Sequence, residues 1–449
     1  MQSELITKYD LRVPRYTSYP TAPHFNDSVS GEIYTRWLGE LDPATELSLY
    51  FHIPFCDEMC SFCGCYTKIV KRYDPVKDYL GALLAEIDLV ADALPTRMTA
   101  RHLHWGGGSP TMLKGEDWLA IMDKLRSRFD VADDAEIAVE LDPRTATDSY
   151  IAELEHAGVN RASIGVQSYE PKVQKAINRI QPYETTKQVI EWLRAHNITR
   201  INMDLMYGLP FQDTAEIERM VDLTVDLQPN RIALFGYAHV PWMKSHQKLI
   251  KEETLPDAAE RWEQFTLAVE RLKVLGYVQI GFDHFAHPDD PMATAVETGD
   301  LHRNFQGYTT DSAPAMLGFG ASSIGYLPQG YVQNESPLKA YSQAIYSGVL
   351  PVARGIALST ADTLHRAIIE DVMCNLTVDL AARCAEYDTD VSTLDGDMEK
   401  LKPLVDDNIC TIDGHTITVT ETGRPFIRLV ASAFDEYLDS GLGRHSKAV

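Results

Sequence analysis

The chain has 449 residues, 45% of them hydrophobic and 24% charged, which excludes disordered, collagen-like and coiled-coil chains and predicts a large globular body with one appendage. Its formal net charge of −24, from 65 acidic and 41 basic residues, argues against binding to nucleic acids. No apolar run approaches about 20 residues, the length of a membrane span, and the polar start lacks the apolar core of a signal peptide. We therefore expect a cytoplasmic protein that does not contact a membrane.

Residues 1–46 form the first region of the chain. The string PRYTSYPTAPHF (14–25) places three prolines among aromatic residues. Proline and the residue before it favour extended backbone. We therefore predict an N-terminal arm that lies over another part of the molecule and covers the active site.

Residues 47–360 form the body, which we expect to contain a barrel and an extension of it. Up to residue 282, short apolar runs alternate with amphipathic segments, a pattern typical of a parallel sheet connected by helices. After Asp74-Pro75, an apolar stripe at helical spacing is expected to face the sheet. About six such units predict an α/β fold, a partial (β/α) barrel, with its chemistry at the C-terminal ends of the strands. The stripe consists of Val76, Leu80, Leu83, Leu84 and Ile87, and the candidate strands are 47–53, 100–105, 136–141, 161–166, 200–207, 231–237 and 278–282.

Residues 361–449 predict a small α+β domain, mostly helical and of winged-helix type. We expect a helical run over 368–380 and a final helix over 424–438. Between them, alternating Ile, Thr and Val around Asp413-Gly414 predict a hairpin. Because the chain is acidic, we interpret this domain as a lid and not as a DNA reader.

Four of the seven cysteines crowd into ten residues, as Cys56, Cys60, Cys63 and Cys65. This spacing leaves little length for disulfides, so the cluster indicates metal binding or redox chemistry. Three thiolates of the CxxxCxxC loop can bind three irons of a [4Fe-4S] cluster and leave the fourth iron open. A zinc site with Cys65 as fourth ligand, or a purely structural loop, are the alternatives. The other cysteines, which we expect to be core thiols, are Cys374, Cys384 and Cys410.

With Phe62 between its last two cysteines, this loop resembles the signature of the radical S-adenosylmethionine (SAM) superfamily. Gly106-Gly107-Gly108-Ser109-Pro110 follows the second predicted strand and resembles the superfamily's glycine-rich loop, which approaches the methionyl group of SAM. The resemblance implies that SAM chelates the open iron. One electron from the cluster then cleaves SAM to methionine and a 5′-deoxyadenosyl radical.

Further strings resemble one family of this superfamily, the oxygen-independent coproporphyrinogen III oxidases of HemN type. They are PRYTSYPTA, YFHIPFC, CSFCGC, HWGGGSPT, GVQSY, DLMYGLP, FGYAHVP, FDHFAHPDD and LHRNFQGYTT. The family decarboxylates the ring A and B propionates of coproporphyrinogen III to vinyl groups, giving protoporphyrinogen IX in haem synthesis. The chain has GGGSP where the family commonly has GGGTP, and its serine keeps the hydroxyl group of that threonine. Cys65 matches a family cysteine that is not a cluster ligand.

The resemblance implies a set of SAM-contacting residues, some of which would serve a second SAM molecule. Glu140 would accept hydrogen bonds from the ribose or the ammonium group, although a solvated strand end is the alternative for this residue. Arg179 suits a carboxylate through its fork geometry. Cys56, Cys60 and Cys63 would bind the cluster. The cofactor-binding residues are Tyr50, Phe62, Gly107, Gly108, Ser109, Glu140, Gln167, Arg179, Asp204, Ala238 and Ile324.

The expected partners are coproporphyrinogen III, an electron donor such as a flavodoxin-like protein, and an electron acceptor that the sequence does not identify. Four propionates need cations, for which Arg15, His302 and Arg303 are candidates, with plain surface solvation as the alternative. We expect a monomer. The alternatives in function are a HemW-like haem chaperone, a HemN-like radical SAM methyltransferase and a zinc-binding structural protein.

Overall fold

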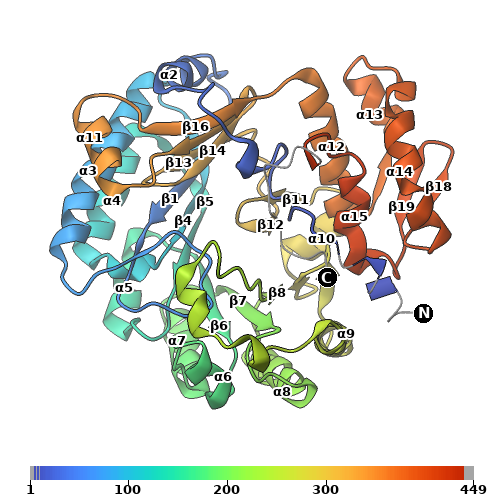
Figure 1. Ribbon diagram of the computed structural model, residues 1–449. Coiled ribbons are helices and arrows are strands. Elements are labelled where there is room, and N and C mark those ends of the chain that lie inside the picture. Colours follow the sequence, from blue (N-terminus) through green and yellow to red (C-terminus); the bar gives the residue numbers. More distant parts are fainter. Residues whose placement is uncertain (1–4, 7, 10, 439–449) are drawn as a thin grey trace.

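The computed structural model describes residues 5–6, 8–9 and 11–438, and a twelve-stranded sheet organises it (Figure 1). The strand order is β16-β15-β14-β13-β1-β4-β5-β6-β7-β8-β10-β9. The run from β13 to β8 is parallel throughout. Its members are β13 (Ala315–Phe319), β1 (Leu47–Ile53), β4 (Thr99–Gly107), β5 (Asp130–Leu141), β6 (Arg161–Gln167), β7 (Arg200–Tyr207) and β8 (Arg231–Gly236).

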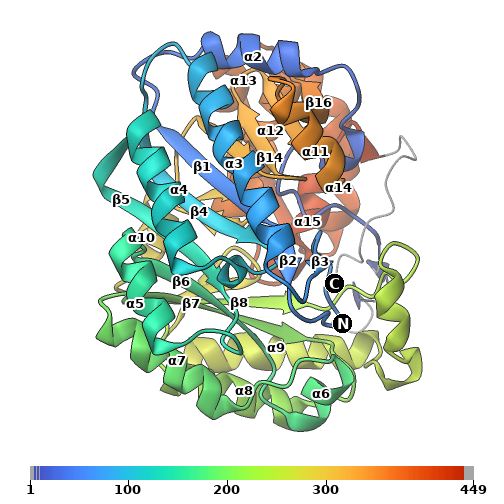
Figure 2. The same cartoon turned by 90° about the vertical axis from the view of Figure 1, so that its left-hand side faces the viewer.

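In the parallel sheet, one long helix follows each strand from β1 through β4, β5, β6 and β7 to β8. These helices cover the outer face of the sheet (Figure 2). The predicted partial barrel of about six βα units is therefore confirmed. Four residues of the predicted stripe on the first helix are buried, whereas Leu84 is only partly buried at its border. The six helices are α3 (Asp74–Ala93), α4 (Gly115–Arg128), α5 (Asp148–Ala157), α7 (Tyr183–Ala195), α8 (Thr214–Asp226) and α9 (Ala258–Val274), and the short α6 (Pro171–Ala176) precedes α7.

The last predicted strand of the parallel series forms, but it belongs to a hairpin. β9 (Val278–Ile280) pairs antiparallel with β10 (His284–Ala286), which in turn pairs antiparallel with β8. Gly281, with a φ of 53°, stands in the short turn between them. Because only three residues separate the two strands, no crossover helix can connect them. The prediction of a seventh parallel strand is therefore wrong.

The sheet continues beyond the barrel on the side of β1. β13 lies parallel to β1, and the next three strands extend from it as an antiparallel meander. The sequence analysis expected an extension of the barrel within residues 47–360 but predicted none of its strands. Its elements, with those that precede and connect them, are α10 (Pro291–Thr298), β11 (His302–Asn304), β12 (Gly307–Thr309), β14 (Ile324–Leu327), β15 (Gly330–Asn334), α11 (Leu338–Tyr346) and β16 (Val352–Ala357).

The C-terminal region contains the predicted hairpin, formed by β18 (Cys410–Asp413) and β19 (Thr416–Val419). The predicted helical run 368–380 is wrong in its second half. Leu376 takes a left-handed φ of 60° and ends α12 (Thr360–Asn375), so that β17 (Thr377–Asp379) can pair with β19. The remaining helices are α13 (Leu380–Glu386), α14 (Asp395–Asp406) and α15 (Ile427–Ser432).

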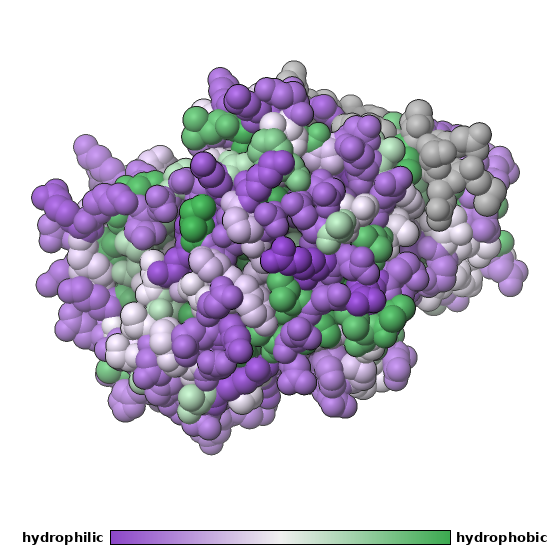
Figure 3. All heavy atoms as spheres, turned by 90° about the horizontal axis from the view of Figure 1, so that it is seen from below, coloured by the Kyte–Doolittle hydropathy of each residue, from purple (hydrophilic) through white to green (hydrophobic). Residues whose placement is uncertain are grey.

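The final helix is also shorter than predicted. After Ser432, the backbone N–H groups of Ala433, Phe434 and Asp435 donate to carbonyls three residues earlier, which turns the chain out of the α-helix. The three scattered cysteines are at most 2% exposed, so their prediction as core thiols is confirmed. On the face of the whole molecule shown in Figure 3, hydrophilic residues predominate and hydrophobic residues form small, separate areas.

The N-terminal arm is packed into the molecule at two places. Tyr9, Val13, Tyr16 and Tyr19 are at most 5% exposed and belong to one hydrophobic core with the C-terminal helices. The Tyr16 hydroxyl donates to Asp435 Oδ2 at 3.0 Å. Farther along the arm, α2 (Gly31–Gly39), which the sequence analysis did not identify, packs on the core of the barrel. The arm therefore bridges the barrel and the C-terminal helices.

Candidate active site

The three cysteines of the CxxxCxxC motif lie on the loop that follows β1. This loop begins in β2 (Phe55–Cys56) and ends in β3 (Lys68–Ile69), which pairs with β2 in parallel. Two contacts tie its middle to the chain after α6: Ser61 N donates to Ile177 O at 2.8 Å, and Asn178 Nδ2 donates to Met59 O at 2.9 Å. The loop is therefore held in place at both ends and in its middle.

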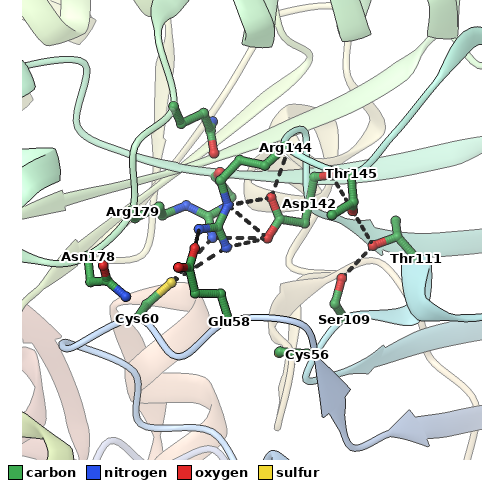
Figure 4. A network of polar contacts seen from close by, with 12 residues as sticks. Cys56, Glu58, Cys60, Ser109, Thr111, Asp142, Arg144, Thr145, Asn178 and Arg179 are labelled. Atoms are coloured by element: carbon green, nitrogen blue, oxygen red, sulfur yellow. Dashed lines mark hydrogen bonds and ion pairs between the residues drawn. The ribbon is translucent and has the colours of Figure 1, made fainter. Parts of the chain in front are cut away.

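Two arginines approach the sulfur of Cys60 from the ends of β5 and α6 (Figure 4). Arg144 Nη2 and Arg179 Nη1 each lie 3.7 Å from Cys60 Sγ. Asp142 Oδ2 lies between them, at 2.7 Å from Arg144 Nη2 and 3.3 Å from Arg179 Nη1. Although burial opposes it, these two positive charges lower the pKa of Asp142. The arrangement places two guanidinium N–H donors on a candidate cluster ligand.

The protonation of the cysteines depends on their surroundings. Burial raises the pKa of Cys56 to about 11, against a hydrogen bond from Thr67 Oγ1 to its sulfur at 3.2 Å. Hydrogen bonding from Cys65 lowers the pKa of Cys63, to whose sulfur the backbone N of Cys65 donates at 3.4 Å. Since thiolates are the ligands that metals bind, metal binding would release the proton of Cys56.

The donor set fits an iron–sulfur cluster. It consists of three thiols on one loop, which at one thiolate per iron can bind three irons of a [4Fe-4S] cluster and leave the fourth iron open. Among the residues that the structure describes, no three His, Cys, Asp or Glu side chains converge closely enough to hold a single metal ion.

The glycine-rich end of β4 lies between the cysteine loop and β5. A Cβ on Gly106 would stand 2.6 Å from Glu140 Oε1, and one on Gly108 would stand 2.7 Å from Phe55 O. Gly107 has a φ of 118°, and its N donates to Glu140 Oε2 at 3.2 Å. The backbone of Phe55 therefore requires Gly108 and the positive φ favours glycine at position 107, whereas a Cβ on Gly106 would displace the carboxylate of Glu140.

Alternation along the strands brings polar side chains together inside the barrel. On β1, Leu49, Phe51 and Ile53 belong to the core under the helices, whereas Tyr50 points to the opposite face. The ring of Tyr50 stacks on His104 of β4 with centroids 5.9 Å apart. His104 Nε2 lies 3.4 Å from Glu140 Oε1.

Asp204, on β7, faces the same interior. Burial, and then the charge of Glu140, raise its pKa to about 6. Asn202 Nδ2 donates to its Oδ1 at 2.8 Å. Glu140 contacts His104 Nε2 and Gly107 N, but its side chain is 42% exposed, so its role toward SAM stays a prediction.

The other expected SAM-contacting residues surround this interior. Gln167 ends β6 with a φ of 69°, and Ser109 Oγ bonds to Thr111 Oγ1 at 2.5 Å. The fork of Arg179 is already engaged by Asp142 and by Gly165 O, at 2.7 Å from its Nη2. The remaining three are Phe62, packed beside α6, Ala238, just beyond β8, and Ile324, at the start of β14.

Ile324 is the farthest of these residues from the cysteines along the chain, but not along the sheet. A Cβ on Gly318 of β13 would stand 2.8 Å from the carbonyl carbon of Ile324, and Gly318 is the register partner of Tyr50. The structure thus brings Ile324 within two strands of Tyr50. The sequence analysis missed Asp142 and Arg144, whose only signal is the polar string that follows the third predicted strand.

Two cavities flank the arm where it crosses the barrel. The first, of about 310 Å³, lies beyond the ends of β7 and β8, and the second, of about 280 Å³, lies beside β11 and α12. Both are rich in cations and aromatic rings. Arg15 lines the first with Arg12, Arg261 and Arg428, and His302 and Arg303 line the second with Arg366.

The cations predicted for substrate binding are connected through the arm. Arg303 Nη2 donates to Arg15 O at 3.3 Å, and its guanidinium carbon lies 4.4 Å from the ring centroid of Tyr308. The carboxylate of Glu370, 3.0 Å from His302 Nδ1, raises the pKa of that imidazole. The sequence analysis missed the arginines contributed by α9, α12 and α15.

Comparison with known proteins identifies the family. A relative from Bradyrhizobium diazoefficiens, called oxygen-independent coproporphyrinogen III oxidase, is 47% identical over 100% of both chains. This chain belongs to that family. A relative of the same name from Paracoccus denitrificans is 40% identical over 100% of this chain and 99% of its own. The structure of the Escherichia coli member HemN, described as a radical SAM enzyme, is 36% identical, with a TM-score of 0.91 over 94% of this chain and 98% of that one.

Two family models agree with this membership. Residues 50–224 match the Radical SAM superfamily, and residues 358–426 match the HemN C-terminal domain. The cofactors of this family member are a [4Fe-4S] cluster and SAM. The full-length similarity favours the oxidase over the haem chaperone, the methyltransferase and the zinc-binding protein. In the described part of the chain, no helix has the length and apolar character needed to cross a membrane.

Proposed function

We propose that this protein catalyses the oxidative decarboxylation of the ring A and B propionates of coproporphyrinogen III, giving protoporphyrinogen IX. The observation that carries the proposal is the similarity of the whole chain to oxygen-independent coproporphyrinogen III oxidases, with the cysteine loop at the C-terminal end of the first barrel strand. Chemistry at that end of the strands is the rule for such barrels.

In this proposal Cys56, Cys60 and Cys63 hold the cluster. Together the cluster and SAM supply a radical that removes a hydrogen atom from a propionate β-carbon. The N–H groups of Arg144 and Arg179 stabilise the thiolate of Cys60, on which both converge at 3.7 Å. Glu140, fixed by Gly107 N, accepts hydrogen bonds from the ammonium group or the ribose of SAM.

We extend the proposal to the whole predicted SAM set and to a second SAM molecule. The interior between β1 and β7 supports it, because Tyr50, Glu140 and Asp204 all face that space. A buried carboxyl such as Asp204 is well suited to accept hydroxyl donors. The set is Tyr50, Phe62, Gly107, Gly108, Ser109, Glu140, Gln167, Arg179, Asp204, Ala238 and Ile324.

The substrate is bound by cations around the arm. A porphyrinogen with four carboxylates needs paired charges when it leaves water. Arg15, His302 and Arg303 meet this need from the two cavities that flank the arm. The barrel body spans residues 47–360. The arm (residues 1–46) and the C-terminal domain (residues 361–449) cover it and exclude water from the radical.

The reaction also needs redox partners. A flavodoxin-like protein delivers the electron that the cluster passes to SAM, and a separate acceptor takes the electron released with CO2. We place the protein in the cytoplasm as a monomer.

The test is an anaerobic assay of the reconstituted protein with coproporphyrinogen III, SAM, a reductant and cell extract as the source of acceptor. Formation of protoporphyrinogen and 5′-deoxyadenosine by the wild type, and of neither by Cys60→Ser, is the expected result. Formation of 5′-deoxyadenosine without protoporphyrinogen would refute the substrate. Absence of both products from protein with a loaded cluster would refute the radical chemistry.

A further inference from the structure

The cysteine loop reaches the protein surface at Gly64 and Cys65, which are both exposed. Two segments border this opening, residues 68–72 (KIVKR) and 244–251 (KSHQKLIK), and we call them the basic collar. Together they contain six Lys or Arg and no Asp or Glu, in a chain whose formal net charge is −24. Such a local concentration of positive charge runs against the overall composition.

Both segments of the collar contact the cysteine loop directly. β2 and β3 pair so that Lys68 lies opposite Phe55 and Ile69 opposite Cys56. From the other segment, Lys244 Nζ donates to Cys65 O at 3.1 Å. The two halves of the collar are therefore fixed to the loop that holds the candidate ligands.

The contacts of segment 244–251 continue along the loop. His246 Nε2 lies 2.7 Å from Cys63 O, and Gln247 Nε2 donates to Phe62 O at 2.9 Å. In Figure 1 this yellow-green segment stands in front of the barrel, beside the blue loop that follows β1, and in Figure 2 it lies at the right-hand side of the barrel. The segment thus forms the outer wall of the cysteine site.

The charges of the collar are available to a partner. Within the residues that the structure describes, none of its six cations forms an ion pair. Apolar side chains stand among them, with Ile69 38%, Met243 64% and Leu249 74% exposed. Exposed apolar groups beside unpaired positive charges are typical of a docking site for an acidic protein.

We propose that the basic collar is the docking surface for the protein that reduces the cluster, and that this donor is an acidic one-electron carrier of the flavodoxin kind. The transfer moves one electron and no atoms: the donor is oxidised by one electron, and the cluster is reduced by one. The inference rests on the proposed function, because that function requires a reducible cluster on this loop. The arginines assigned to the anionic substrate line other cavities and are not part of the collar.

Charge reversal tests the docking surface. Two double variants, Lys248→Glu/Lys251→Glu and Lys71→Glu/Arg72→Glu, change exposed side chains that make no ion pair with the described residues. The control, Lys187→Glu/Lys402→Glu, makes the same change in net charge on α7 and α14, where both lysines are more than half exposed. The measurement is the anaerobic stopped-flow rate of cluster reduction by photoreduced flavodoxin at several salt concentrations.

We expect each collar variant to be reduced about tenfold more slowly than wild type at low salt, with the difference vanishing at high salt. The control variant should match the wild type. With excess dithionite in place of flavodoxin, all variants should form 5′-deoxyadenosine as the wild type does. These results together would support the docking surface.

Three outcomes would overturn the inference. Equal rates of reduction by flavodoxin in wild type and collar variants would show that the donor docks elsewhere. A raised KM for coproporphyrinogen III in the collar variants would assign the charges to the substrate instead. Failure of the wild type to form 5′-deoxyadenosine even with dithionite would refute the proposed function, and with it this inference.

Discussion

Replacing Asp142 by asparagine removes the central charge of the network beside Cys60. The side chains of Asp142, Arg144 and Arg179 are only 13%, 14% and 9% exposed. Asp142→Asn keeps the shape of the side chain but leaves Arg179 without its carboxylate and Arg144 with only the half-exposed Glu58, whose Oε2 lies 3.7 Å from Arg144 Nη1. Because the desolvation of both charges is then no longer fully offset, we expect the protein to lose stability.

The expected loss is about 3–5 kcal/mol, the range found when one partner of a buried ion pair is removed. Arg144 contributes most to it, since its Nη2 lies 2.7 Å from Asp142 Oδ2, against 3.3 Å for Nη1 of Arg179. The matched control is Asp134→Asn. Asp134 pairs with Arg101 at 2.9 Å, but its side chain is 78% exposed, so this change should cost less than about 1 kcal/mol.

Anaerobic guanidinium unfolding, followed by circular dichroism, measures both losses. The pKa of Asp142 is lowered in the folded protein, so its stabilisation is complete above the unfolded pKa of about 3.9 and disappears as the pH falls through the folded value. The difference between wild type and Asp142→Asn should therefore be full at pH 7 and shrink below about pH 4. A loss as small as that of Asp134→Asn at pH 7 would refute the role of the buried network.

Three further predictions concern the cysteines, a buried carboxyl and the substrate. Cys60→Ser should lose the iron and the visible absorption of the reconstituted cluster, whereas Cys65→Ser should keep both. Iron analysis measures the difference, and loss of iron from Cys65→Ser would show that Cys65 is a cluster ligand. Burial raises the pKa of Glu86 to about 7, so this carboxyl keeps its proton to a higher pH in the folded protein than in the unfolded chain. Stability should therefore fall by about 3 kcal/mol as the pH rises from about 4.5 to about 7, and an equally steep fall in Glu86→Gln would contradict this. Arg303→Met should raise the KM for coproporphyrinogen III at least about tenfold with a smaller effect on kcat, because one charge-assisted hydrogen bond is lost. An unchanged KM would show that Arg303 does not bind the substrate.

The features that sequence analysis predicted correctly depend on residues close together in the chain. The candidate cluster ligands lie within eight consecutive residues, so their spacing alone identifies the motif. Each βα unit likewise has its own apolar run and its own amphipathic helix. The hairpin at Asp413-Gly414 follows from the turn that this dipeptide favours.

The features that were missed depend on contacts between distant segments. The pairing of β13 with β1 joins Ala315 to Leu47, and Tyr16 of the arm reaches Asp435. Such contacts produce no periodic pattern in the local sequence. Arg144 was missed because an arginine after a strand is usually solvated, and only the fold brings it to Cys60.

The central claim is that a radical formed at this site removes hydrogen from the substrate's propionate β-carbon. The most direct measurement uses coproporphyrinogen III deuterated at those carbons, incubated anaerobically with the reconstituted protein, SAM and reductant, followed by mass spectrometry of the 5′-deoxyadenosine. The account predicts 5′-deoxyadenosine that carries deuterium from the substrate. Unlabelled 5′-deoxyadenosine formed together with protoporphyrinogen would contradict it.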